Sequence, residues 1–200
     1  MKFKRTALIV SLSFLAACGS DSTSPSDIIN GAISGSLSFN YTGGGGGSYS
    51  ATGAITSAAL ASSPFTTTWA IGFKNATDNS TNVAANIPKT TNVSDIAAIS
   101  VKGQSTGTFS IDPACTVTKT STCNDVSLFI GQNSSTGTFG SVCTLTAGSI
   151  GISSLSSTNA TGVFSGSGSC VSSAGSVSTW VVLNGTFNVP VLAGVPSTIP

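Results

Sequence analysis

The chain of 200 residues offers few side chains for catalysis. It contains six Asp but no Glu and no His, which excludes a Ser–His–Asp triad and any histidine metal ligand. A pair of Asp carboxylates or a Ser/Lys or Thr/Lys dyad remains available. Thr116 and Lys119 have suitable identities, but on a strand they would face opposite sides. We therefore expect that the protein is not an enzyme and that it binds neither a metal ion nor a cofactor. A hydrolase that uses Asp or a Ser/Lys pair is the less favoured alternative.

The N-terminal segment has the features of a secretory signal. Three basic residues within the first five precede the apolar stretch Thr6–Leu15, which is too short to cross a membrane as a helix. The sequence Leu15-Ala16-Ala17-Cys18 follows and resembles a bacterial lipobox. In lipoproteins of this kind the cysteine thiol receives a diacylglycerol, a peptidase cuts before the cysteine, and the new amine is acylated. The resemblance implies a signal peptide at residues 1–17 and a membrane anchor of two or three acyl chains on Cys18.

The residues after Cys18 predict where the anchored protein resides. Gly19 stands where Asp signals inner-membrane retention in Gram-negative lipoproteins, so the resemblance implies the outer membrane, on either its periplasmic or its surface face. Residues 18–27 are small and polar, and we interpret them as a flexible tether. Without the signal peptide the chain carries four Lys and six Asp, a net charge of −2. This charge disfavours nucleic acid as a partner.

The four remaining cysteines indicate disulfides. An even number of cysteines in an exported chain is typical of paired thiols, and four cysteines allow three pairings. We favour Cys115–Cys123 and Cys143–Cys170, because neighbours in the sequence close the shortest loops. A thiolate metal site is disfavoured, because the chain has neither a C-x-x-C spacing nor a histidine.

The rest of the chain alternates with a period of two. In Ile33–Tyr41, Tyr49–Ile55 and Thr67–Phe73 the large apolar residues all stand at odd-numbered positions. Further short strands are expected at 96–102, 116–119, 126–130, 142–146, 149–153, 162–166, 177–183 and 186–191. Only Ser57–Ala61 and Ser94–Ala98 are candidates for short helical turns. Many short strands between frequent turns predict an antiparallel β-sandwich, with a small closed β-barrel as the alternative and little or no helix outside the signal peptide. Composition is uniform, so we expect one domain at residues 28–195 and a loose tail at 196–200.

Three further segments could bind a ligand. Trp180 has the opposite parity to Val177, Val181 and Leu183, which predicts an outward-facing indole that could stack on a sugar. The oxygen-rich loop 75–82 contains one carboxylate, too few for a Ca²⁺ site, and we interpret it as a solvated turn. The glycines at 43–47 lack the Lys of a phosphate-binding loop and predict a mobile hairpin loop.

A short motif of Gly, then Thr or Val, then Phe recurs along the chain. Its copies begin at Gly107, Gly137, Gly162 and Gly185. The intervals between the copies drift, which argues against a solenoid. We expect each glycine to let two strands approach and each phenylalanine to point into the core.

The whole chain resembles small, Ser/Thr/Gly-rich, all-β bacterial lipoproteins of unknown function. The likeness is carried by Leu15–Gly19, the Asp21–Pro25 tether, Gly148–Ile152, Gly162–Gly166 and Asn184–Val189. It implies a lipid-anchored envelope protein whose β domain has a binding or structural role without catalysis. A carbohydrate-binding surface module is the alternative. A glycan or an envelope protein is the expected partner, while the oligomeric state stays open.

Overall fold

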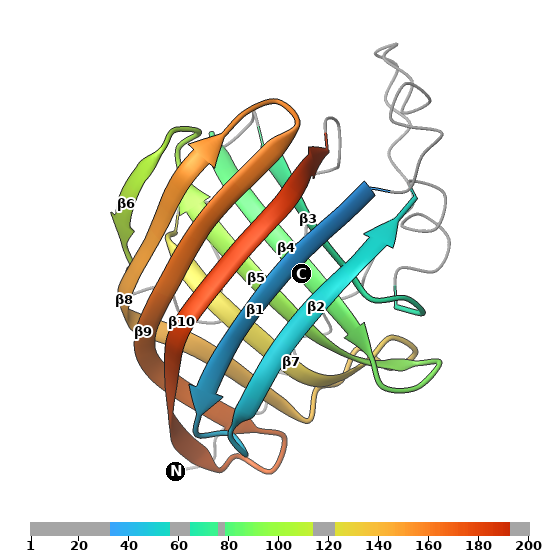
Figure 1. Ribbon diagram of the computed structural model, residues 1–200. Helices are drawn as coiled ribbons and strands as arrows, with labels where there is room; N and C mark the ends of the chain where they lie inside the picture. Colours follow the sequence, from blue (N-terminus) through green and yellow to red (C-terminus); the bar gives the residue numbers. More distant parts are fainter. Residues whose placement is uncertain (1–32, 57–64, 76–78, 114–122, 193–200) are drawn as a thin grey trace.

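The computed structural model describes residues 33–56, 65–75, 79–113 and 123–192, and these contain ten strands and no helix (Figure 1). The expected all-β class is confirmed for this part of the chain. Cys18, the tether, Cys115 and the tail at 196–200 lie outside the described residues. The strands are β1 (Ile33–Thr42), β2 (Gly47–Ile55), β3 (Trp69–Asn75), β4 (Ser80–Pro88), β5 (Val93–Lys102), β6 (Gly107–Ser110), β7 (Asp125–Asn133), β8 (Ser141–Leu155), β9 (Asn159–Ser172) and β10 (Val177–Leu192).

Seven of these strands close into a barrel. Their order is β10-β3-β4-β5-β7-β8-β9 and back to β10. The small closed barrel therefore fits, and the antiparallel sandwich is not confirmed. A sandwich would consist of two separate sheets, but here two long strands, β8 and β10, each pair with strands of both sheets and so join them. β10 continues past β1 to pair in parallel with β3 at Val191 and Leu192, and β8 pairs first with β7 and then with β6.

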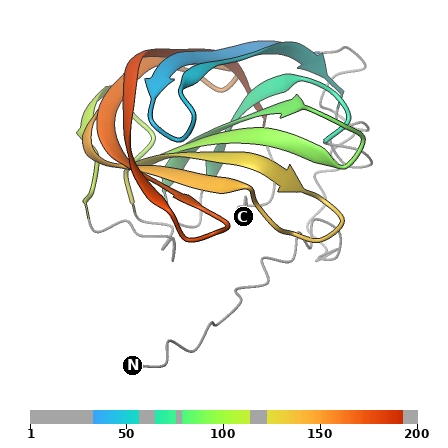
Figure 2. The ribbon, with the colours of Figure 1, turned by 90° about the horizontal axis from the view of Figure 1, so that it is seen from below.

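The remaining strands extend one side of the barrel. β1 pairs with β10, β2 pairs with β1, and β6 pairs with β8. We call the paired set β2, β1, β10, β9, β8 and β6 the neutral wall; the charged residues of the described strands all lie in β3, β5 and β7 of the other set, which also includes the uncharged β4. We call β3, β4, β5 and β7 the charged wall. Figure 2 shows the blue β1–β2 hairpin and the red β10 along one side, with the green and yellow strands along the other.

Alternation along the strands places apolar side chains inside the barrel. On the neutral wall the inward residues are separated by exposed or half-buried small residues, as in Leu37-Ser38-Phe39 of β1. The interior is filled rather than hollow at its centre, where Phe39 lies 5.2 Å from Tyr49, 5.5 Å from Phe164 and 6.3 Å from Trp180 between ring centroids. Burial of this apolar area is the main contribution that stabilises the barrel.

Two copies of the Gly-x-Phe motif, at Gly162 and Gly185, pack against each other. In the β9–β10 ladder Gly162 lies opposite Phe187, and Gly185 lies opposite Phe164. A Cβ atom at Gly162 would come within 2.7 Å of the Phe187 ring, and one at Gly185 equally close to the Phe164 ring. Each glycine thus leaves the space that the phenylalanine of the other copy fills. Both rings are buried, which confirms the expected core role for these two copies.

Three local predictions are wrong. Ser94–Ala98 belongs to the strand β5 and forms no helical turn. β4 was not expected, because its residues do not alternate between apolar and polar. β8 and β10 are each continuous where two shorter strands were expected. β4 and β5 are buried on both faces, and such strands lose the period-two pattern on which the predictions rest.

Candidate functional site

The charges are segregated to one side of the molecule. Among the residues that the structure describes, every Lys and Asp lies in β3, β5 or β7, or in the segments that join β4 to β5 and β6 to β7. The outer face of the neutral wall instead presents Ser, Thr, Asn and Gly, together with a few exposed apolar residues. Of these, Val171 and Val177 lie opposite each other on β9 and β10. This face spans six strands and carries no charged residue, and it is the candidate interaction surface.

Register places its hydroxyl groups in rows across the strands. One row runs through β2, β1, β10, β9, β8 and β6, and its members are Ser50, Ser38, Thr186, Val163, Gly151 and Thr108. Four of these six residues carry a hydroxyl group, and Val163 and Gly151 interrupt the row. The hydroxyls of Ser38 and Thr186 are hydrogen-bonded at 3.2 Å, and those of Ser153 and Thr161 at 3.0 Å. The surface can therefore donate and accept hydrogen bonds, but it offers no charge to a ligand.

Trp180 does not belong to this surface. Its side chain is 0% exposed and lies in the barrel core, whereas Val177 and Leu183 are 69% and 51% exposed. The predicted partition of these residues between two faces is correct, but the prediction that Trp180 faces outward is wrong. The bulky indole fills the barrel interior, and the smaller aliphatic residues remain outside. Because the ring is fully buried, it cannot serve as a sugar platform in this arrangement. Within the described part of the chain the indole N–H has no hydrogen-bond partner.

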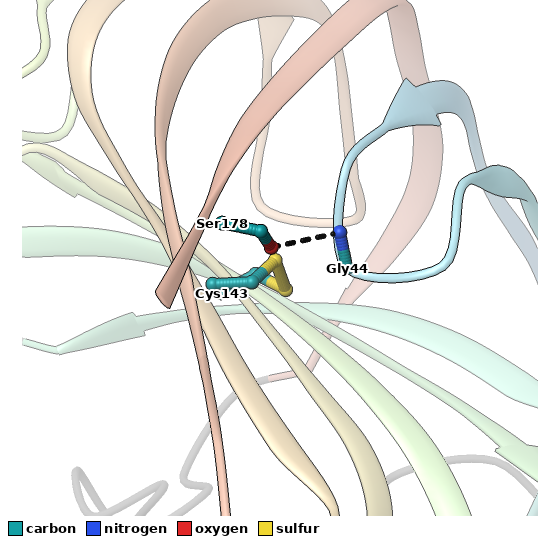
Figure 3. The surroundings of a disulfide bond; sticks show 4 residues. Gly44, Cys143 and Ser178 are labelled. Carbon is teal, nitrogen blue, oxygen red and sulfur yellow. Dashed lines mark hydrogen bonds between the residues drawn. A yellow bond between two sulfur atoms is a disulfide. The ribbon is translucent and has the colours of Figure 1, made fainter. Parts of the chain in front are cut away.

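The disulfide Cys143–Cys170 links directly opposed residues of β8 and β9, which confirms that pairing (Figure 3). Both cysteines are buried, and the glycine loop of the β1–β2 hairpin covers them. The Gly44 N–H donates a hydrogen bond to the Ser178 hydroxyl at 3.1 Å. Gly44 has a φ of +61°, and a Cβ atom there would lie 2.6 Å from the Cys170 Sγ. The loop closes a hairpin as predicted, and it packs on the disulfide because glycine alone fits.

The second predicted disulfide is only partly within the described residues. Cys123 is disulfide-bonded. Its proposed partner Cys115 lies outside them, so the pairing Cys115–Cys123 stays a prediction. Thr116 and Lys119 also lie outside the described residues, so the interpretation of that pair stays a prediction as well.

The carboxylates occupy separate positions on and beside the charged wall. Lys89 pairs with Asp95 at 3.0 Å, and Lys102 pairs with Asp112 at 3.0 Å. The Asn124 backbone N–H and Lys102 together lower the pKa of the Asp112 carboxyl. Asp125 is buried and accepts a hydrogen bond from the Ser127 hydroxyl at 3.4 Å. No three potential metal ligands gather in the described ranges.

One tyrosine ties the two walls together inside the barrel. Tyr49 projects from β2, and its hydroxyl donates to the Ala85 carbonyl of β4 at 2.8 Å while accepting from the Ala97 N–H of β5 at 3.3 Å. Burial raises the pKa of the Tyr49 hydroxyl far above its ordinary value. The hydroxyl therefore stays neutral and links β2 to the backbones of β4 and β5.

Comparison of the chain with protein-family models, with curated proteins and with solved structures found no match. In the segments that the structure describes, no helix is long and apolar enough to cross a membrane.

Proposed function

We propose that this chain is a lipid-anchored bacterial envelope protein whose β-barrel has a binding or structural role and no catalytic one. The lipobox Leu15–Cys18 supports the anchor, and Gly19 supports the outer membrane as its location. The role of the barrel rests on the neutral wall. A wide face of small uncharged side chains suits contact with a neighbouring surface through hydrogen bonds, with little cost of burying charge.

The arrangement of the titratable groups supports a non-catalytic role. A general acid and base or a nucleophile and base must converge on one position. Two of the three described carboxylates instead pair with lysines, and Asp125 accepts a hydrogen bond from a serine on its own strand. A carbohydrate-binding role is the second candidate. The hydroxyl rows around Ser38 and Thr186 favour it, although it loses Trp180 as its aromatic platform.

The anchor is tested by producing the full chain in a Gram-negative host fed with an alkyne-labelled fatty acid. We expect label on the protein and sedimentation with the outer membrane, and we expect Cys18→Ser to lose both. Gly19→Asp is the matched control, because it keeps the thiol but should move the labelled protein to the inner membrane. Unlabelled wild-type protein, or membrane association that survives in Cys18→Ser, would refute the anchor.

The carbohydrate role is tested with a glycan array and the full chain solubilised in detergent. We expect any bound glycan to be lost in the double variant Ser38→Lys/Thr186→Lys, which places two bulky cations in the middle of the hydroxyl rows. No binding by the wild type would leave the structural role. Binding that the variant retains would show that the glycan does not bind at Ser38 and Thr186.

A further inference from the structure

β2 is an edge strand along its whole length. Its residues pair with β1 from Gly47 to Ile55, and the strand order of the sheet ends at β2 (Figure 1). Within the described part of the chain, no backbone hydrogen bond joins β2 to any strand other than β1. Among the described residues, alternate N–H and C=O groups along these nine residues therefore have no strand as partner, and they could pair with another strand.

This edge lacks the features by which edge strands usually avoid pairing. Lysines, prolines and bulges are the common protections. β2 reads GSYSATGAI, with no charge and no proline, and its register with β1 runs without a shift from Ile33↔Ile55 to Tyr41↔Gly47. By contrast, the β1–β10, β5–β7, β8–β9 and β9–β10 ladders all contain register shifts.

The side chains of β2 are compatible with a second strand at this edge. Tyr49 and Ala51 are buried in the main core, and Ile55 is buried against Ile71 and Phe73 of β3. Pairing at this edge therefore requires no new apolar contact. Ser48, Ser50 and Thr52 are exposed on the outer side. Small hydroxyl side chains can lie opposite one another without the repulsion that like charges produce.

We propose that β2 pairs in antiparallel fashion with β2 of a second copy of this chain, forming a two-fold symmetric dimer. The described sheet has one other edge, at β6, which is only four residues long. A β2–β6 contact would bury at most four residues and would leave free edges for open-ended growth. A β2–β2 contact uses up to nine residues from each copy and closes. A neutral strand also offers nothing to select a charged peptide as partner.

The proposal concerns the barrel and does not depend on the lipid anchor. It would join two neutral walls into one continuous outer face of hydroxyl side chains, because the pairing extends the sheet in its own plane. The dimer would double the surface proposed above for binding.

The test is sedimentation velocity of the full chain in density-matched detergent, over a range of concentrations. We expect a dimer for the wild type. The double variant Ser50→Lys/Thr52→Lys, which places four lysines at the paired edges of a dimer, should raise the dissociation constant about tenfold or more. The matched control is Ser165→Lys/Ser167→Lys, which puts the same charges on exposed positions of β9, inside the sheet. We expect the control to remain dimeric.

Hydrogen exchange provides a second readout that does not depend on a variant. Alternate amides of β2 should exchange more slowly as the protein concentration rises, while the amides of β6 should not change. A monomer at all concentrations, or a dimer that the β9 control disrupts as strongly as the β2 variant, would overturn the proposal. A covalent dimer on a non-reducing gel or open-ended filaments would overturn it as well.

Discussion

Side chains alternate between the two faces of the strands in both walls of the barrel, but the two walls differ in how many of these faces are buried. The neutral wall buries only its inner face, and its outer face carries small hydroxyl residues. The charged wall buries both faces. Ala70 and Val83 point into the barrel, while Ile71 and Phe73 form a second apolar cluster on the outside. In a strand that is buried on one face only, the alternation of apolar and polar residues shows which residues face the core. A strand that is buried on both faces has no such alternation.

The outer face of the charged wall contributes to the stability of the barrel, whereas the outer face of the neutral wall is available for interaction with a partner. Substitutions on the outer side should be costly on the charged wall and nearly free on the neutral wall. A surface that can vary at little cost in stability can be adapted to a partner. The following variants test this difference, in order of decreasing expected effect on the free energy of unfolding.

Trp180→Ala should produce the largest loss, about 4 kcal/mol, because it empties the centre of the barrel interior. Leu183→Ala on the same strand should change the free energy of unfolding by less than about 0.5 kcal/mol, since Leu183 is exposed. Urea unfolding followed by far-ultraviolet circular dichroism measures both. Equal effects of the two variants would contradict the inward position of Trp180.

Ile71→Ala and Val163→Ala compare the outer faces of the two walls. Ile71 is 2% exposed in the outer cluster of the charged wall, and its truncation should cost about 3 kcal/mol. Val163 is 58% exposed on β9, and its truncation should cost less than about 0.5 kcal/mol. Urea midpoints at constant m-value provide the measurement. A small effect at Ile71 would mean that the outer side of β3 is not a second core.

Removal of the Cys143–Cys170 disulfide should destabilise the neutral wall by about 2–3 kcal/mol, because the bond closes a loop of 27 residues in the unfolded chain. The variant is Cys143→Ala/Cys170→Ala. The neighbouring cross-strand pair gives the control Thr144→Ala/Ser169→Ala, which should cost well under about 1 kcal/mol. Thermal unfolding of both variants provides the measurement. Unfolding midpoints that do not differ between the two variants would show that the disulfide contributes no stability.

Asp112→Asn should have the smallest effect, less than about 1 kcal/mol at neutral pH, because the ion pair with Lys102 is solvent-screened. The folded-state pKa of Asp112 is lowered, so its contribution is present above the unfolded-state pKa. That contribution is lost as the pH falls through the folded-state pKa. The difference between wild type and variant, measured by urea unfolding from neutral to acidic pH, should shrink on acidification. A difference that grows on acidification would contradict the assignment.

Some features could be predicted because they depend on neighbours in the sequence. The all-β class follows from alternation and scarce helix formers, and the Cys143–Cys170 pairing follows from the preference for a short loop. The position of the glycine loop as a hairpin connection also follows from composition. β4 could not be predicted in this way, because it is buried on both faces and its apolar and polar residues do not alternate.

The sequence by itself determined which residues share a face of each strand. Val177, Val181 and Leu183 lie together, and Trp180 lies opposite them, because the backbone pleat alone imposes this partition. Only the tertiary structure decided which face is inside and that the sheet closes into a barrel. That choice depends on the volume enclosed by strands far apart in the sequence. The large indole fills this interior, and the exposed β2 edge is likewise a product of closure elsewhere in the sheet.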